Sequence, residues 1–248
     1  MARQNLYDRE RFFEHFAALR GDPINFNDCI ETPILLAMLP ELRGLRVLDL
    51  GCGMGQHARQ YAEMGAASVL GIDLSEKMLA CAVAHNGAPN IAYRRMAMED
   101  IGELEGRFDL VTSSLAFDYV EDLRALLARV HGLLEDGGRL VFSMSHPMAT
   151  AWDGVFDRFT RTESGERLYA NLRNYCVEGL RRVKWVEDDY EHYHRTMATL
   201  INSMIEAGFA IEECRESEAS EALRARYPAK FGGTVHRPDF VFFRCAKK

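Results

Sequence analysis

Residues 47–56, which read VLDLGCGMGQ, form the segment that most limits how this chain can fold. An apolar run broken only by Asp49 leads directly into Gly51, Gly53 and Gly55. A buried strand that ends in glycines lets the backbone turn tightly and lets a ligand lie against bare main chain. The helix that follows offers free N–H groups in its first turn. The segment therefore predicts a strand, a ligand-binding loop and a helix.

The spacing of the glycines indicates the kind of ligand. Dinucleotide-binding folds usually read G-x-G-x-x-G, with the pyrophosphate on the helix N-terminus. This chain reads D-x-G-x-G-x-G instead, with Asp49 two residues before the first glycine. A carboxylate there would repel a pyrophosphate and attract an α-ammonium group. The spacing therefore favours a cofactor that carries an amino acid over NAD.

A second acidic residue follows the glycine loop at a spacing that indicates a further binding role. Residues 68–75 read as a short buried strand that ends in Asp73, 22 residues past Gly51. An acid at about this distance is typical of ribose-hydroxyl recognition. A structural turn remains the alternative for the glycine loop taken alone, and a solvated strand-end acid remains the alternative for Asp73.

This combination of motifs resembles the class I S-adenosylmethionine (SAM)-dependent methyltransferases, and more narrowly their small-molecule branch, the type 11 or ubiquinone-biosynthesis-like group. The resemblance implies an α/β fold with a seven-stranded Rossmann-like sheet in the order 3-2-1-4-5-7-6, the last strand antiparallel. It implies SAM as cofactor and S-adenosylhomocysteine as product. It places Asp49, Gly51, Gly53 and Gly55 at the methionine end of SAM. Asp73 is placed at the ribose, and Leu74 is expected to bind the cofactor beside it.

The segments after the third and fourth strands are expected to complete the cofactor site. In the family an acid and the next backbone N–H hold the adenine, but Ala97 stands at the usual acid position. Met98 is therefore expected to cover the adenine, and Glu99 or Asp100 to accept its exocyclic amine. An ordinary polar loop with a core methionine is the alternative. Ser114, at the end of the fourth strand, is also expected to bind the cofactor.

Strands and helices alternate through most of the chain, which predicts one α/β domain over residues 1–248. The hydrophobic content of 48% is ample for one large core. Strands are predicted at 45–50, 68–72, 90–94, 108–113, 139–145, 209–212 and 240–243. Helices are predicted at 6–19, 29–39, 55–64, 75–85, 121–134 and 197–207. A turn over 232–238 is expected to join the last two strands.

Two segments are predicted to cover the site. Residues 147–195, called the insertion below, are rich in aromatic residues and do not fit the alternation. A connection this long inside a compact domain is usually functional, and it follows the fifth strand at the edge where open α/β sheets bind ligands. We expect the insertion to act as a substrate cap together with the N-terminal helices in residues 1–40. A satellite core is the alternative for its aromatic residues.

The candidate catalytic residue is His146, at the end of the fifth strand. An imidazole there could remove a proton from the acceptor near neutral pH, although a histidine before proline is often only a turn residue. Small-molecule relatives often have a histidine where Asp118 stands, and Tyr119 is expected in the core. Residues 190–196 are expected to form a polar helix start, with a base or a carboxylate-binding arginine as the alternative. Methyl transfer needs chiefly alignment and desolvation, so a general base is not required.

The composition limits which classes of molecule this protein can bind. The formal net charge is −7, no dense Lys/Arg stripe is present and the N/D-P-P-Y/F motif of base-amine methyltransferases is missing, all of which argue against nucleic acid. The six cysteines form no C-x-x-C pair, and no apolar run is long enough for a bilayer. We expect a cytoplasmic enzyme with a small-molecule acceptor, without metal or membrane contact. A tRNA or protein methyltransferase and a catalytically silent SAM-binding regulator are the alternatives; the sequence leaves the oligomeric state open.

The glycine spacing leads to a binding prediction. The protein should bind SAM and S-adenosylhomocysteine but not NAD, because a carboxylate at Asp49 attracts an ammonium and repels a pyrophosphate. Titration calorimetry with each ligand checks this. Micromolar binding of NAD without binding of SAM would contradict it.

Overall fold

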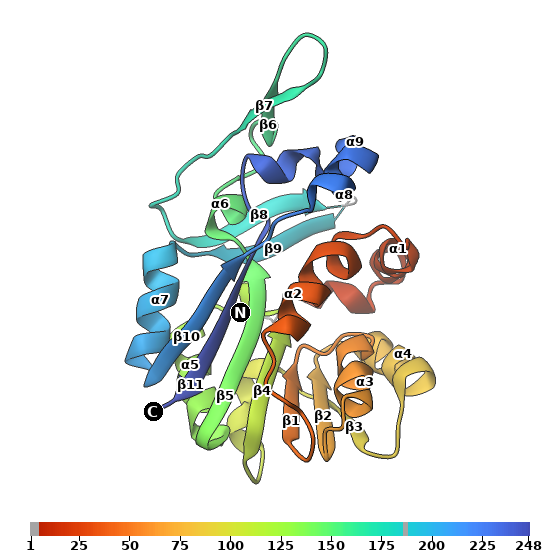
Figure 1. Ribbon diagram of the computed structural model, residues 1–248, viewed down its shortest axis with the longest axis vertical. Helices are drawn as coiled ribbons and strands as arrows, with labels where there is room; N and C mark the ends of the chain where they lie inside the picture. Colours follow the sequence, from red (N-terminus) through yellow and green to blue (C-terminus); the bar gives the residue numbers. More distant parts are fainter. Residues whose placement is uncertain (1–4, 186–187) are drawn as a thin grey trace.

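Seven strands form one sheet, in the order β10-β11-β5-β4-β1-β2-β3 (Figure 1). The computed structural model describes residues 5–185 and 188–248. The strands are β1 (Arg46–Leu50), β2 (Ser68–Asp73), β3 (Ile91–Arg95), β4 (Phe108–Ser114), β5 (Leu134–Ser145), β10 (Phe209–Glu216) and β11 (Phe240–Lys247). The first five are parallel, and β11 pairs antiparallel with both β5 and β10. The predicted order 3-2-1-4-5-7-6 with an antiparallel last strand is confirmed.

Helices cover both faces because the strand residues alternate between them. In β1, Val47 packs on one face with α2 (Thr32–Ala37) and α3 (Gln56–Glu63), whereas Leu48 packs on the other. That second face is covered by α5 (Leu123–Leu133) and α7 (Met197–Glu206). The helix α4 (Glu76–Asn86) lies beside α3 at the β3 edge. A strand buried on both faces reads as an apolar run, which explains why the core strands were predictable.

The strand β5 begins five residues earlier than predicted. Phe108 of β4 faces Leu134, but Leu110, only two residues on, already faces Arg139. Residues 135–138 therefore form a bulge inside β5, where Gly137 has a φ of +78°. The register shift follows from this extra loop of chain, because two residues of β4 are spanned by five of β5.

The N-terminal segment is less regular than predicted. A 3₁₀ turn, η1 (Leu6–Asp8), precedes α1 (Glu10–Gly21), and a short π-helical turn, η2 (Asn27–Glu31), leads into α2. Of the predicted N-terminal segment 1–40, residues 1–4 lie outside the described residues. Side chains tie the segment to the sheet, since Asp8 accepts a hydrogen bond from the hydroxyl of Ser75 (2.6 Å) at the start of α4.

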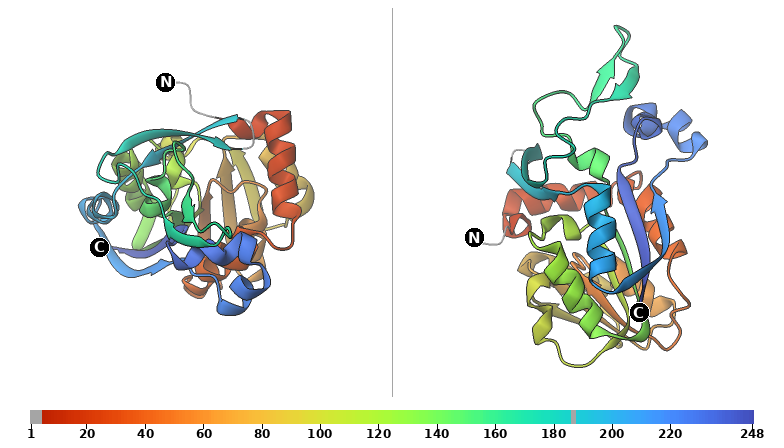
Figure 2. Two further views of the ribbon diagram at one scale, coloured as in Figure 1. Left: turned by 90° about the horizontal axis from the view of Figure 1, so that it is seen from above. Right: turned by 90° about the vertical axis from the view of Figure 1, so that its left-hand side faces the viewer.

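The insertion is built from a short helix and two hairpins. The helix is α6 (Pro147–Thr150), and the hairpins are β6 (Phe159–Arg161) with β7 (Arg167–Ala170) and β8 (Gly179–Trp185) with β9 (Asp188–His194). The β6–β7 hairpin projects from the top of the molecule in Figure 1 and in the right-hand view of Figure 2. The prediction of a helix start over 190–196 was wrong: the chain is a strand to His194, and Thr196 caps α7 by accepting from Thr199 N.

The connection between the last two strands is also longer than the predicted turn. It contains α8 (Glu221–Arg226), α9 (Pro228–Phe231) and the 3₁₀ turn η5 (Gly232–Val235). Phe231 packs with Ile30 of η2 in a small separate core. The connection, the insertion and the N-terminal segment all lie above the same end of the sheet (Figures 1 and 2). No helix among the described residues is long and apolar enough to cross a membrane.

The close packing of the glycine loop gives a stability prediction. Gly55 has a φ of +80°, and a Cβ there would collide with the hydroxyl of Tyr93 on β3. Gly55→Ala should lower the free energy of unfolding by about 2–5 kcal/mol, from the left-handed backbone and the overpacking together. Urea denaturation measures the loss.

The matched control is Gly44→Ala. Gly44 has the same φ of +80°, but nothing lies within 4 Å of its Cβ position. Only the backbone term applies, about 1–2 kcal/mol. Equal losses for the two variants would show that the contact with Tyr93 carries no energy.

Candidate functional site

A cavity of about 440 Å³ lies over the carboxyl ends of β1, β2 and β4. Pockets for small molecules generally span about 300–1,000 Å³. The structure brings seven of the nine predicted cofactor-binding residues to its wall: Gly51, Gly53, Asp73, Leu74, Met98, Glu99 and Ser114. Asp49 and Gly55 lie outside it. Carboxyl ends of parallel strands are the edge at which open α/β sheets bind ligands, so the cavity occupies the expected place.

Asp73 organises the cofactor end of this cavity. One carboxylate oxygen, Oδ2, accepts from the N–H of Gly53 (2.9 Å), and Oδ1 accepts from the N–H of Ser75 (2.8 Å). Burial raises the pKa of Asp73, and these backbone hydrogen bonds lower it. A carboxylate has about four lone-pair sites, so acceptor capacity remains for a ligand. The same side chain therefore fixes the glycine loop, starts α4 and can receive hydroxyl groups.

Bare main chain faces the ligand at the glycine loop. A Cβ on Gly51 would lie 2.5 Å from the Cβ of Ala116, whereas a Cβ on Gly53 would meet nothing within 4 Å. Gly51 is therefore required by the packing of the loop against the end of β4. The open space at Gly53 is on the cavity wall, where a ligand can approach the backbone closely.

Asp49 is buried below the loop rather than on the cavity wall. Its Oδ1 accepts a long hydrogen bond from the hydroxyl of Thr112 (3.3 Å), and Oδ2 has no partner among the described residues. Burial is the main cause that raises the pKa of Asp49 to about 7, and the nearby charges of Asp73 and Glu31 add to it. An unpaired buried oxygen costs free energy. A bound cation is the kind of group that would offset this cost.

Glu31 is a site residue that the sequence analysis missed. Its side chain is fully buried, and Oε1 accepts hydrogen bonds from the hydroxyls of Ser143 (2.6 Å) and Ser114 (2.9 Å). Glu31 therefore joins the N-terminal segment to the ends of β4 and β5. A signal was available, because Glu31 stands four residues before Leu35 and seven before Met38, both fully buried, and so shares their helix face.

Three tyrosines form the opposite wall. The hydroxyls of Tyr7 and Tyr119 are 2.7 Å apart, and the rings of Tyr119 and Tyr190 are 5.7 Å apart at 82°. Burial raises the pKa of Tyr7 to about 12 and also raises that of Tyr119 and of Tyr190. The expectation that Tyr119 belongs to the core was wrong, since its ring lines the cavity. The cluster joins η1, the segment after β4 and the strand β9.

His146 lies outside the cavity. Its Nδ1 accepts from the N–H of Met148 (3.0 Å), so Nε2 carries the proton and donates to Glu216 on β10 (2.9 Å). Burial is the main cause that lowers the pKa of His146. Both ring nitrogens are engaged away from the cavity, so the structure does not bring His146 to the place where it was expected to act. Asp118 is also buried, and its Oδ2 accepts from Ser145 N (2.9 Å).

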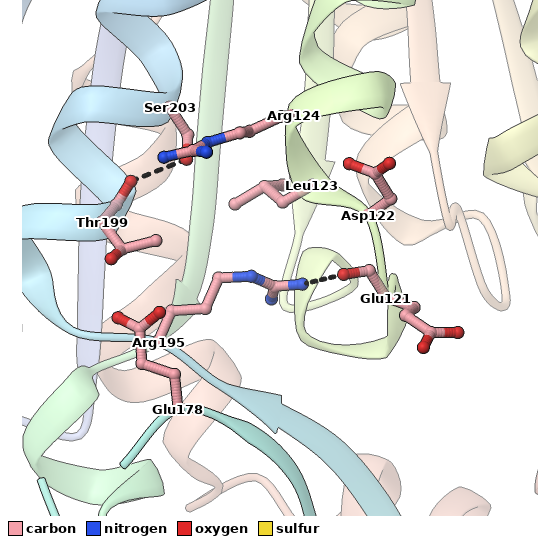
Figure 3. Close-up of a pocket in the computed structure, with 8 residues that line it drawn as sticks. All are labelled: Glu121, Asp122, Leu123, Arg124, Glu178, Arg195, Thr199 and Ser203. Carbon is pink, nitrogen blue, oxygen red and sulfur yellow. Dashed lines mark hydrogen bonds between the residues drawn. The ribbon is translucent and has the colours of Figure 1, made fainter. Parts of the chain in front are cut away.

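A smaller hollow of about 250 Å³ lies between the starts of α5 and α7, next to Glu121 (Figure 3). Arg195 crosses it, and its guanidinium donates to the carbonyl oxygens of Val120 and Glu121 (3.0 Å to the latter). Glu178 accepts from the N–H and the hydroxyl of Thr196, both at 2.7 Å. The polar groups of this hollow are used by the protein itself.

Comparison with known proteins identifies the family. Residues 47–138 match the sequence profile of a methyltransferase domain. A protein of Haemophilus influenzae without an assigned function is 37% identical over 98% of this chain and 97% of its own. The crystal structure of a SAM-dependent methyltransferase from Mesorhizobium loti is 39% identical, with a TM-score of 0.79, and the alignment covers 88% of this chain and 97% of that one. The chain belongs to the class I SAM-dependent methyltransferases.

Similarity to a ubiquinone biosynthesis O-methyltransferase of Neisseria meningitidis is limited to part of the molecule. The two are 39% identical over 42% of this chain and 45% of the relative. This methyltransferase thus shares less than half its length with that enzyme.

The residues present fit SAM. Asp73 retains lone pairs for ribose hydroxyls, the loop at Gly53 leaves room beside the main chain, and the unpaired oxygen of Asp49 suits a nearby cation. The predicted cofactor is therefore compatible with the donor and acceptor groups of this methyltransferase.

The burial of Asp49 gives a prediction for stability against pH. The folded protein holds a proton on Asp49 up to pH about 7, whereas the unfolded chain releases it near pH 4. The contribution of Asp49 to the free energy of unfolding therefore becomes more unfavourable as the pH rises from about 4 to about 7. Asp49→Asn should raise the free energy of unfolding at pH 8 by up to about 4 kcal/mol, an effect that fades toward pH 4. It should also weaken SAM binding at pH 8. Denaturation and calorimetry without and with SAM measure both.

The matched control is Asp109→Asn on β4. A hydrogen bond from Arg46 is the main cause that lowers the pKa of Asp109, so losing this charge should destabilise the protein above pH 4, the opposite sign. A loss of stability at pH 8 in Asp49→Asn as well would contradict the proposed cost of burying Asp49.

Proposed function

We propose that this methyltransferase acts on a small-molecule acceptor held between the cofactor and the two covering segments. The observation that carries the proposal is the shared cavity. The residues expected at the cofactor line the same space as Tyr7 and Phe16 of the N-terminal segment and Leu180 and Tyr190 of the insertion. A covered cavity of this size suits a small molecule, and the insertion acts as its cap. The protein works in the cytoplasm.

Each cofactor-site residue has a proposed role. Asp73 accepts the ribose hydroxyls, with Leu74 beside it, and the main chain at Gly51 and Gly53 lies along the methionine end. Asp49 compensates the α-ammonium from below the loop, and Gly55 is needed for the turn into α3. Met98 covers the adenine, Glu99 accepts its amine, and Ser114 marks the end of β4 on the wall.

SAM supplies a methyl group already activated on a sulfonium. The protein therefore contributes alignment and the exclusion of water. Among the described residues on the wall there is no histidine, and burial raises the pKa of Tyr7, Tyr119 and Tyr190 still further above physiological pH, so these tyrosines stay neutral. His146 is proposed to act only through position, by fixing the end of β5 against Glu216 of β10.

A methyl-transfer assay tests the proposal and separates it from its alternatives. The protein is incubated with SAM carrying an isotope-labelled methyl group and with cell extract divided into low-mass, tRNA and protein fractions. We expect label in the low-mass fraction. Label on tRNA or protein would contradict the proposal, and SAM binding without any transfer would favour the silent regulator.

Asp73→Ala and Asp136→Ala form the matched pair for this assay. Asp73→Ala removes charge-assisted hydrogen bonds worth about 1.5–3 kcal/mol each, so SAM affinity should fall more than tenfold and labelling with it. Asp136 is fully exposed at the opposite end of the sheet, and its loss should change neither. Unchanged SAM affinity in Asp73→Ala would mean that the ribose is held elsewhere.

A further inference from the structure

We propose that the acceptor group of this methyltransferase is an amine, recognised by a cage of tyrosine rings and carboxylates that disfavours acidic acceptors. The inference rests on the proposed small-molecule function and names the chemical class of the substrate. It comes from the acceptor half of the cavity, the part contributed by the N-terminal segment, the end of β4 and the insertion.

Three tyrosine rings pack edge to face at the acceptor end of the cavity. The ring planes of Tyr7 and Tyr119 meet at 78°, with centroids 6.3 Å apart, and those of Tyr119 and Tyr190 meet at 82°. The hydroxyls of Tyr7 and Tyr119 bond to each other, which fixes these two rings, and all three tyrosines line the cavity. The face of a neutral aromatic ring attracts a cation, and walls of several rings are how proteins bind quaternary ammonium groups.

The charges on the cavity wall have one sign. The charged side chains among the described lining residues are Asp73, Glu99, Glu121 and Glu191, and none is Lys, Arg or His. Asp73 and Glu99 belong to the cofactor end. Glu191 directly follows Tyr190 in the sequence and Glu121 stands two residues after Tyr119, so both belong to the acceptor end. Because SAM carries only one net positive charge, a cationic acceptor is still favoured beside it.

The arginines nearest the acceptor end do not reverse this charge. Arg182 bonds to Glu191, with 2.5 Å between Nε and Oε1. Arg195 lines the smaller hollow, where it donates to main-chain carbonyls (Figure 3), and its guanidinium lies over the ring of Tyr193, 5.6 Å from the centroid. Both arginines are thus engaged by groups of the protein, so a carboxylate or phosphate on the acceptor would meet the carboxylate of Glu121, which opposes binding.

The acid–base groups point to the same class. An alcohol, phenol or thiol must lose its proton to become a strong nucleophile, and the described residues of the cavity wall include no histidine, lysine or cysteine for that task. An amine that binds as its ammonium form first releases one proton to water, and the neutral amine then carries a lone pair. That pair forms the new N–C bond to the methyl group, the electrons of the C–S bond stay on sulfur, and the proton of the product ammonium passes to water.

Three isosteric probes test the cage by binding alone. Choline stands in for the methylated product, 3,3-dimethylbutan-1-ol is its neutral counterpart, and 3,3-dimethylbutanoate carries a negative charge. Each is titrated into the protein saturated with S-adenosylhomocysteine. We expect choline to bind at least tenfold more tightly than the alcohol, as cation–π contacts in a desolvated site allow, and the carboxylate not to bind. Equal or tighter binding of the carboxylate would overturn the proposal.

Variants of the cage separate the acceptor from the cofactor. Tyr190→Leu should lower choline affinity about tenfold, whereas Tyr190→Phe keeps the ring face and most of the affinity. Glu121→Gln should narrow the gap between choline and the alcohol. Unchanged choline affinity in Tyr190→Leu would overturn the proposal. So would a variant that binds SAM more weakly but S-adenosylhomocysteine as tightly as before, because the rings would then contact the sulfonium of SAM rather than the acceptor. Failure of the proposed function would give a different result, because no labelled methyl group would then reach the low-mass fraction in the transfer assay.

Discussion

The free energy cost of burying carboxylates around one glycine loop is the constraint on which the rest of this site depends. Three acids meet there, and each is accommodated differently. Asp73 is held by two backbone N–H groups, and Glu31 by two serine hydroxyls. Asp49 receives only one long hydrogen bond, so burial raises its pKa to about 7. A cationic cofactor would stabilise the ionised form of Asp49, so its binding would offset part of the cost of burying this carboxylate.

The parts of the molecule predicted from the sequence are those that local chemistry specifies. The strand before Gly51, the acid at Asp73 and the alternation of strands and helices depend on neighbours in sequence, and the sheet order follows from the family that these motifs indicate. The missed features depend on distant contacts. Tyr7 and Tyr119 are 112 residues apart, and nothing near either residue in the chain indicates that their hydroxyls meet.

Two wrong assignments have identifiable physical reasons. In residues 190–194 the side chains of His192 and His194 are both buried on β9, a period of two that is typical of a strand. The high polarity of the segment concealed that pattern. His146 stands where a base was expected along the chain, but a side chain's direction depends on its partner. Glu216 of the last-but-one strand and the N–H of Met148 hold the ring elsewhere.

The tyrosine cluster joins three segments that fold from separate parts of the chain, whereas the cofactor end is built almost entirely from residues 47–114. Substrate choice and cofactor use are therefore encoded in different stretches of sequence. A change in η1 or β9 can reshape the acceptor wall while the glycine loop and Asp73 remain as they are. Related proteins can therefore acquire new substrates through substitutions in the covering segments, while selection preserves the cofactor-binding residues at the carboxyl ends of the strands.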